Sequence, residues 1–96
     1  MPGSAPPDAD YVRQFGLALR RRRDLRGWSQ EQLAGAASLN RSYVGEIERG
    51  EAVASLQSAQ KLARALGLPL SDLLRETERR HHELTLRRRS LAAIAG

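Results

Sequence analysis

Cysteine is absent from this 96-residue sequence, and aromatic side chains make up only 4% of it. Without cysteine the chain has no disulfide, no thiol nucleophile and no cysteine-ligated metal site. No apolar run approaches the length that spans a bilayer, and the N-terminus lacks the apolar core of a signal peptide. We therefore expect a cytoplasmic protein with no membrane partner, built around one modest hydrophobic core.

The motifs of common catalytic and cofactor sites are also missing. The sequence has no Gly-rich phosphate loop, no nucleophile elbow and no pair of converging carboxylates. His81 and His82 are the only histidines, and Glu78 with His82 at one-turn spacing offers a metal only two ligands. Because surface histidine on a helix is the commoner explanation, we predict no enzyme, no catalytic residue, no metal site and no cofactor.

Basic residues outnumber acidic ones. The chain has 16 Lys and Arg residues against 11 Asp and Glu residues, which gives a net charge of +5 and a pI of about 11.0. Lys61 is the only lysine, and a GC-rich genome alone would explain that preference for arginine. It would not explain the net excess of positive charge, which favours a polyanionic partner such as nucleic acid.

Residues 29–50 have the pattern of two short helices joined by a tight turn. Ser29 and Gln32 have the spacing of a capping box at a helix start. Trp28, just before the cap, can pack on Leu33 as a hydrophobic staple. The first helix of the pair is therefore expected to start immediately after Ser29.

The second helix of the pair is expected to follow the break at Ser38. Asn40 can cap it, Val44 and Ile47 fall on one side of it, and Gly50 can end it in a left-handed conformation. The opposite side carries chemically varied polar groups that reach outward: Arg41, Ser42, Tyr43, Glu46 and Arg49.

In these features the sequence resembles the lambda-repressor-like regulators, also called the Cro and cI or Xre type. The run from Leu17 to Leu74 follows the usual order of that family. It has a basic first helix, Gly27, a Ser29-Gln30 helix start, an Ile47-Glu48-Arg49-Gly50 helix end, then Ser55-Leu56 and Leu62-Ala63-Arg64-Ala65-Leu66-Gly67. The resemblance implies an all-α, compact five-helix DNA-binding domain.

Two positions depart from the family pattern. Ser38 stands where the turn usually has glycine, and Val53-Ala54 stands where an Asn-Pro pair usually precedes the fourth helix. Glycine at the turn normally serves a positive φ angle. Ser38 therefore implies mild strain or a slightly different turn.

The resemblance also implies a role for individual residues. Four align with positions that face base edges in the major groove or lie beside them: Arg41, Ser42, Glu46 and Tyr43. Four align with positions that hold phosphate or buttress the reading side chains: Ser29, Gln30, Asn40 and Arg49. The chemistry agrees, because arginine can fork onto guanine and glutamate can accept from cytosine N4. Arg23 and Glu48 align with a structural ion pair beneath the reading helix.

We predict three parts in the chain. Residues 1–9 are rich in proline and have no basic side chain, so we expect a disordered arm without a role in a DNA groove. Residues 10–76 form the helix-turn-helix domain, with a helix starting at about Asp10. Ser55 caps its fourth helix, whose expected core residues are Leu56, Ala59, Leu62, Ala63 and Leu66. Residues 77–96 form a C-terminal helical extension.

No glycine or proline occurs between Leu70 and Gly96, a range that begins before the extension and includes it. Over this range leucine or threonine recurs every seven residues, at 70, 77, 84 and 91. This spacing is consistent with a long helix that has a dimerising seam. A charged, partly frayed tail with a solvated arginine face is the alternative. The apolar residues assigned to a dimer contact are Leu84, Leu86, Leu91 and Ile94.

Taken together, the resemblance implies a sequence-specific regulator of transcription that binds a palindromic or near-palindromic double-stranded DNA operator as a homodimer. Its size and domain content are similar to those of the controller proteins of restriction-modification systems. The rival interpretation is an antitoxin or protein-interaction module that uses the same scaffold and binds another protein through the C-terminal helix. The polar groups of Arg41, Ser42 and Arg49 favour the DNA-binding interpretation, because a vestigial reading helix would have lost them.

Overall fold

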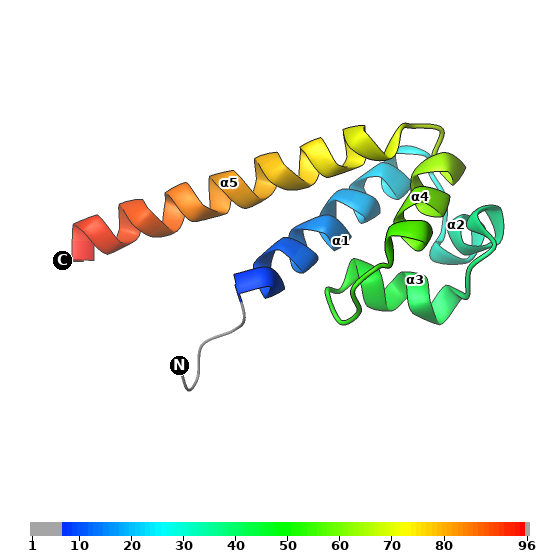
Figure 1. Ribbon diagram of the computed structural model, residues 1–96, viewed down its shortest axis with the longest axis horizontal. Coiled ribbons are helices and arrows are strands. Elements are labelled where there is room, and N and C mark those ends of the chain that lie inside the picture. The colour runs from blue at the N-terminus through cyan, green and yellow to red at the C-terminus, as the bar shows by residue number, and fades with distance from the viewer. Residues whose placement is uncertain (1–6, 96) are drawn as a thin grey trace.

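The structure is a computed structural model that describes residues 7–95. In that range the chain forms five α-helices and no strand (Figure 1): α1 Pro7–Leu25, α2 Gln30–Ala37, α3 Arg41–Glu48, α4 Leu56–Ala65 and α5 Leu70–Ala95. The predicted all-α, five-helix class is confirmed.

The helix starts follow the predicted caps. Ser29 Oγ accepts a hydrogen bond from the Gln32 backbone N–H at 3.1 Å, and Gln32 Oε1 accepts one from the Ser29 N–H at 2.8 Å. Asn40 Oδ1 accepts from the Ser42 N–H at 2.7 Å. These bonds satisfy backbone donors that a helix start leaves without a partner, and so they fix where α2 and α3 begin.

The helix ends are set by left-handed residues. Gly27, Gly50 and Gly67 have φ angles of 70°, 75° and 75°, and each lies just after a helix. Ser38, at the end of α2, has φ 56° and ψ 44°. The serine therefore adopts the left-handed conformation that family members usually give to glycine, and this is the strain that its position implied.

Each of the five helices contributes a fully buried side chain to one core, namely Leu19, Leu33, Ile47, Leu62 and Leu73. The core lies between α1 to α4 and the first half of α5. The helix α1 passes α3 at very short range, because a Cβ built on Gly16 would lie 2.3 Å from the Ile47 carbonyl oxygen. Glycine at this position therefore permits the close packing of α1 against α3.

The start of α1 differs from the prediction. The helix α1 begins at Pro7 and not at about Asp10, so residues 7–9 of the expected disordered arm are helical. Proline suits the first position of a helix because its missing N–H would have no partner there. The rest of the expected arm, residues 1–6, lies outside the described residues.

Leu56 was predicted to lie in the core, and this is wrong. Its exposed fraction is 78%, whereas the other expected core residues of α4 are buried. Leu56 is the first residue of α4, so its side chain projects beyond the neighbouring helices, at the edge of an apolar groove.

The C-terminal extension is helical and continuous with the fifth helix of the domain. Figure 1 shows the first half of α5 beside α1, and the last turns of α5 running on past the start of α1. The Tyr11 hydroxyl donates to Glu78 at 3.2 Å, and the Tyr11 ring meets the edge of the His81 ring at 5.5 Å. Further along, Arg88 forms an ion pair with Asp10. Residues 77–88 are therefore part of the packed structure.

Candidate nucleic-acid interface

The outer side of α3 presents the predicted reading residues around one polar hollow. The hollow has a volume of about 380 Å³ and is lined by Gln30, Arg41, Ser42, Gly45, Glu46 and Arg49. On the inner side of the same helix, Val44 and Ile47 are buried in the core. Amphipathic spacing thus holds α3 against the domain and turns the side chains of Arg41, Ser42 and Glu46 to the outside.

Gly45 gives the hollow its depth, and the sequence analysis did not identify it. A Cβ at this position would lie 3.0 Å from Arg49 Nη1 and 3.4 Å from Gln30 Oε1. A glycine inside a helix costs about 1 kcal/mol relative to alanine. A glycine in the middle of α3 was therefore the sequence feature that could have indicated that the Arg49 and Gln30 side chains lie close to the backbone here.

Arg23 and Glu48 are brought together directly beneath the reading helix. Arg23 Nε donates to Glu48 Oε2 at 2.7 Å, and Arg23 Nη2 donates to Glu48 Oε1 at 3.0 Å. The hydrogen bond to Glu48 raises the pKa of Arg23 above its usual range, against partial burial, which lowers it. Arg23 Nη1 also donates to the Trp28 carbonyl at 2.8 Å, which ties this pair to the α1–α2 turn.

Gln30 extends the same network to the start of α2. Its Nε2 donates to Glu48 Oε1 at 3.0 Å, so one carboxylate joins α1, α2 and α3. The Gln30 side chain therefore acts as a buttress. Because Gln30 is the first residue of α2, its backbone N–H lies among the groups that the helix itself leaves unpaired.

Ser29 and Asn40 use their side-chain oxygens as caps, as described above. Their contribution at a phosphate would therefore come through the helix starts that they fix. A helix N-terminus combines unpaired N–H groups with a partial positive charge, which suits a phosphate. The α2 and α3 starts lie at the two sides of the hollow, since Gln30 and Arg41 both line it.

Arg49 is paired within the chain. Its Nε donates to Glu51 Oε2 at 3.1 Å, and its Nη2 lies 3.1 Å from Glu51 Oε1. This contact raises the pKa of Arg49 and lowers the pKa of Glu51. Glu51 was not among the predicted site residues, and its position two residues after Arg49 was the only signal for it.

Tyr43 does not belong with the outward-facing residues. It is half-buried against the core, and its hydroxyl oxygen accepts a hydrogen bond from the Ser55 N–H at 3.3 Å. Hydrogen bonding with the Ser58 hydroxyl and with Ser55 lowers the pKa of the Tyr43 phenol, against desolvation, which raises it. The segment that leads to Ser55 returns over the Tyr43 hydroxyl, so Tyr43 does not line the hollow with Arg41, Ser42 and Glu46, and its place beside the base-reading residues stays a prediction.

The four apolar residues assigned to a dimer contact differ in exposure. Leu84 is half-buried, whereas Leu86, Leu91 and Ile94 are exposed, Ile94 to 82%. At about 100° per residue, Leu86, Ile94 and Leu91 follow one another over an arc of about 140° around the helix axis. Their role in a dimer contact stays a prediction.

The described residues contain neither a metal-binding cluster nor a membrane-spanning helix. His82 is exposed, and within residues 7–95 no three His, Cys, Asp or Glu side chains converge as a metal site would require. Over the same range, no helix combines the length and apolar character that crossing a membrane would require.

The chain is similar in sequence and in fold to known helix-turn-helix proteins. The helix-turn-helix family matches residues 19–73. A hypothetical transcription factor of Neisseria meningitidis serogroup B is 35% identical over 74 residues, which cover 77% of this chain and 70% of that protein. The crystal structure of the restriction-modification controller protein C.AhdI from Aeromonas hydrophila has a TM-score of 0.64 and 45% identity, over 65% of this chain and 94% of that one.

A third likeness extends into the C-terminal helix. The clp gene regulator ClgR from Corynebacterium glutamicum has a TM-score of 0.78 and 28% identity, over 88% of each chain. The family match spans the reading helix, its buttress and the caps of α2 and α3. The chain therefore belongs to the lambda-repressor-like, Xre-type helix-turn-helix family of DNA-binding transcriptional regulators.

Proposed function

We propose that this protein binds a specific double-stranded DNA operator as a homodimer and regulates transcription from it. The observation that carries the proposal is the set of outward groups on α3, Arg41, Ser42 and Glu46, held over a buried and fully partnered Glu48. Arginine can contact guanine with two hydrogen bonds, serine can meet either base, and glutamate can accept from cytosine. In this arrangement Arg41 and Glu46 are the principal base-reading residues.

The alternative of an antitoxin or protein-interaction module is less well supported. The relatives named above are, by their descriptions, a transcription factor, a controller protein and a gene regulator. The hollow at α3 is polar and bounded by charged side chains, whereas a groove that binds a partner's amphipathic helix is usually apolar. We therefore assign this face to DNA.

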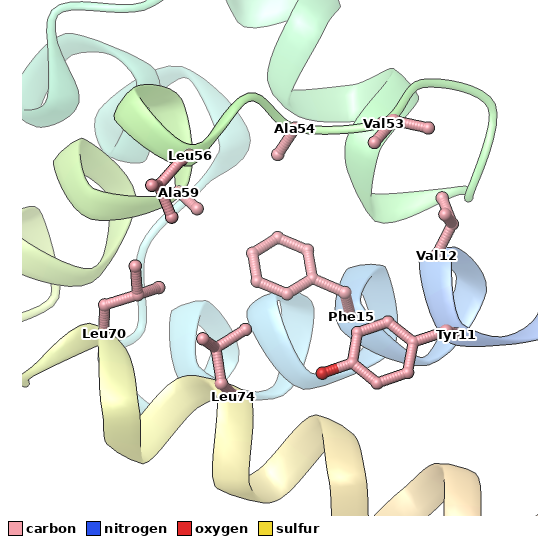
Figure 2. Close-up of a pocket in the computed structure, with 9 residues that line it drawn as sticks. All are labelled: Tyr11, Val12, Phe15, Val53, Ala54, Leu56, Ala59, Leu70 and Leu74. Carbon is pink, nitrogen blue, oxygen red and sulfur yellow. The ribbon is translucent and has the colours of Figure 1, made fainter. Parts of the chain in front are cut away.

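A dimer needs a contact that fixes the two reading helices about 34 Å apart. The structure offers an apolar groove for this purpose (Figure 2), with a volume of about 270 Å³. Phe15 points into it, and Val53 and Leu56 stand at its edge with exposed fractions of 72% and 78%. The whole lining consists of Tyr11, Val12, Phe15, Val53, Ala54, Leu56, Ala59, Leu70 and Leu74.

We assign this groove to a second copy of the chain for two reasons. It is bordered by the segment that directly follows α3, so a contact here controls the position of the reading helix. Charge also favours it, because residues 1–78 carry a net charge of only +1, whereas residues 79–96 hold five arginines and one glutamate. Two copies paired through their C-terminal segments would repel each other.

Selection of bound duplexes from a random pool, followed by binding of an Arg41→Ala variant, tests the reading role. The variant should lose about 1 to 3 kcal/mol on the preferred operator and relax the preference at one base pair of each half-site. Arg75→Ala is the matched control, because Arg75 is an exposed arginine on α5. An equal loss on preferred and random DNA with Arg41→Ala would reverse the assignment.

Sedimentation equilibrium tests the dimer contact. Leu56→Glu should dissociate the dimer and remove cooperative binding to the operator. Leu91→Glu introduces the same charge at an exposed leucine near the end of α5 and should leave the dimer intact. If Leu91→Glu dissociates the dimer and Leu56→Glu does not, the contact lies on the C-terminal extension and the groove serves another purpose.

A further inference from the structure

The C-terminal half of α5 is one of two basic parts of the chain, the other being α1, where residues 13–26 hold six arginines and one aspartate. Residues 79–96 contain Arg79, Arg80, Arg87, Arg88 and Arg89 and a single acidic residue, Glu83. Arg79, Arg80 and Arg88 are paired with carboxylates, whereas Arg87 and Arg89 are exposed near the end of the helix. Long-range attraction of DNA should therefore also act at a surface other than the reading helix.

The reading face itself is close to neutral. Arg41 and Glu46 line the same hollow, and Arg49 is paired with Glu51. These groups can specify bases and position α3. They supply little of the sequence-independent attraction that phosphate contacts give to DNA-binding proteins.

The basic segment lies apart from α3 in the fold. The helix α1 packs against α3 and also against α5, and Figure 1 shows the last turns of α5 on the far side of α1 from α3. Arg88 is held by Asp10 at the start of α1, which fixes the direction of the segment. Arg87 and Arg89 are exposed. DNA that is seated on α3 would therefore not meet these arginines at the same position along the duplex.

We propose that residues 79–95 of α5 bind the phosphates of a second segment of duplex DNA, independently of its sequence, while α3 holds the operator. This inference rests on the proposed function, since it assumes a complex with an operator. Arg88 is held by Asp10, whereas Arg87 and Arg89 are exposed and point about 160° apart around the helix axis. A polyanion can therefore be contacted from two sides of α5.

Other occupants fit this segment less well. An anionic membrane surface is bound by helices that gather their apolar residues on one face, whereas Arg87 falls between Ile94 and Leu91 around the axis of α5 and interrupts their apolar side. A second copy of the same segment would bring two charges of +4 together. Duplex DNA supplies regularly spaced negative charge, and a chain of this family is already positioned close to it.

A bridging assay tests the proposal. The full-length protein is first bound to an immobilised palindromic operator, which occupies both reading helices of a dimer. A labelled random-sequence duplex is then added, and its capture is measured over a range of salt concentrations. The tail variant combines Arg79→Gln, Arg87→Gln and Arg89→Gln. It should capture at least roughly tenfold less of the labelled duplex, and the salt dependence of capture should fall by up to about three ions.

The control variant combines Arg20→Gln, Arg64→Gln and Arg75→Gln, three exposed arginines outside both α3 and the C-terminal segment. It loses the same charge and should capture the second duplex as the unmodified protein does. Equal loss in both variants, or no loss in either, would overturn the proposal. Dissociation of the dimer by the tail variant alone would overturn it too, because that would make the segment a self-contact.

Operator binding is measured on the same samples and separates this proposal from the function of α3. The tail variant should keep the operator preference of the unmodified protein. Absence of any preferred sequence in the unmodified protein would contradict the proposed function, whereas intact preference without capture of the second duplex would contradict only the inference about α5.

Discussion

The Glu48 carboxylate lies against the Arg23 guanidinium in a two-pronged contact, with N–O distances of 2.7 and 3.0 Å. The Glu48 side chain is 2% exposed and that of Arg23 is 11% exposed. Glu48 is the last residue of α3, and Arg23 lies in the last turn of α1. The ion pair therefore fixes the C-terminal end of α3, the reading helix, against the last turn of α1.

Removal of either partner should destabilise the fold severely. Arg23→Ala or Glu48→Ala leaves the other charge buried without its bidentate ionic partner, and each should lower the free energy of unfolding by roughly 3 to 5 kcal/mol. Urea unfolding of the two single variants and of the double variant measures this effect. The double variant should lose much less than the sum of the two single losses.

The Arg79–Glu83 pair on α5 is the matched control, since both side chains are about 60% exposed. Glu83→Ala should change the unfolding free energy by less than about 1 kcal/mol. Small and additive losses for Arg23→Ala and Glu48→Ala would mean that their contact contributes no more than this exposed pair.

Much of the fold could be predicted from local sequence, because a helix start depends on groups only a few residues apart. Ser29 with Gln32, and Asn40, mark the starts of α2 and α3, and the structure contains the corresponding hydrogen bonds. The ion pair of Arg23 with Glu48 was different, since 25 residues separate the partners. Only resemblance to a family supplied that pairing in advance.

The features that the sequence did not predict concern contacts that spacing along one helix does not determine. Tyr43 has a polar tip and a position at the edge of the outer face of α3, but the segment leading to Ser55 returns over it. Leu56 has core spacing along α4, but as the first residue of that helix it lies at the edge of the apolar groove and is 78% exposed. Asp10 and Arg88 are 78 residues apart, and their contact arises only because α1 and α5 lie side by side.

Ser38 offers a direct test of backbone strain. It has φ 56° without being glycine, so Ser38→Gly should raise the unfolding free energy by about 0.5 to 1 kcal/mol. Gly27→Ala is the opposite control: its φ is 70°, and an added Cβ would meet nothing within 4 Å. That variant should lose about 1 kcal/mol through backbone conformation alone. A loss of stability in Ser38→Gly would show that the serine side chain has a role beyond the turn.

The contact between the start of α1 and the end of α5 should depend on pH. The hydrogen bond with Arg88 lowers the pKa of Asp10 below its usual value, although desolvation opposes it. The stabilisation is therefore complete above the usual carboxyl pKa and is lost as pH falls through the lowered value. Carboxyl NMR titration should show a low midpoint for Asp10, and Arg88→Gln should move that midpoint upward. An unchanged midpoint would mean that the ion pair is not formed in solution.

The pairing of Arg49 with Glu51 should restrain binding to DNA. Glu51 contacts Nε and Nη2 of Arg49 and places a negative charge beside the reading helix. Glu51→Gln removes that charge and releases Arg49 toward phosphate. Affinity for preferred and random duplexes should rise alike, by several-fold at low salt, and the salt dependence of binding should increase by about one ion.

Asp72→Asn is the matched control for Glu51→Gln, because Asp72 forms a similar exposed pair with Arg75 at 3.3 Å on α5. If both variants raise affinity equally, the effect reflects only net charge. If Glu51→Gln weakens binding, then Glu51 positions Arg49 for its phosphate contact, and the pair is part of the bound state. An increase confined to Glu51→Gln, with unchanged sequence preference, requires that Arg49 leave Glu51 when DNA is bound.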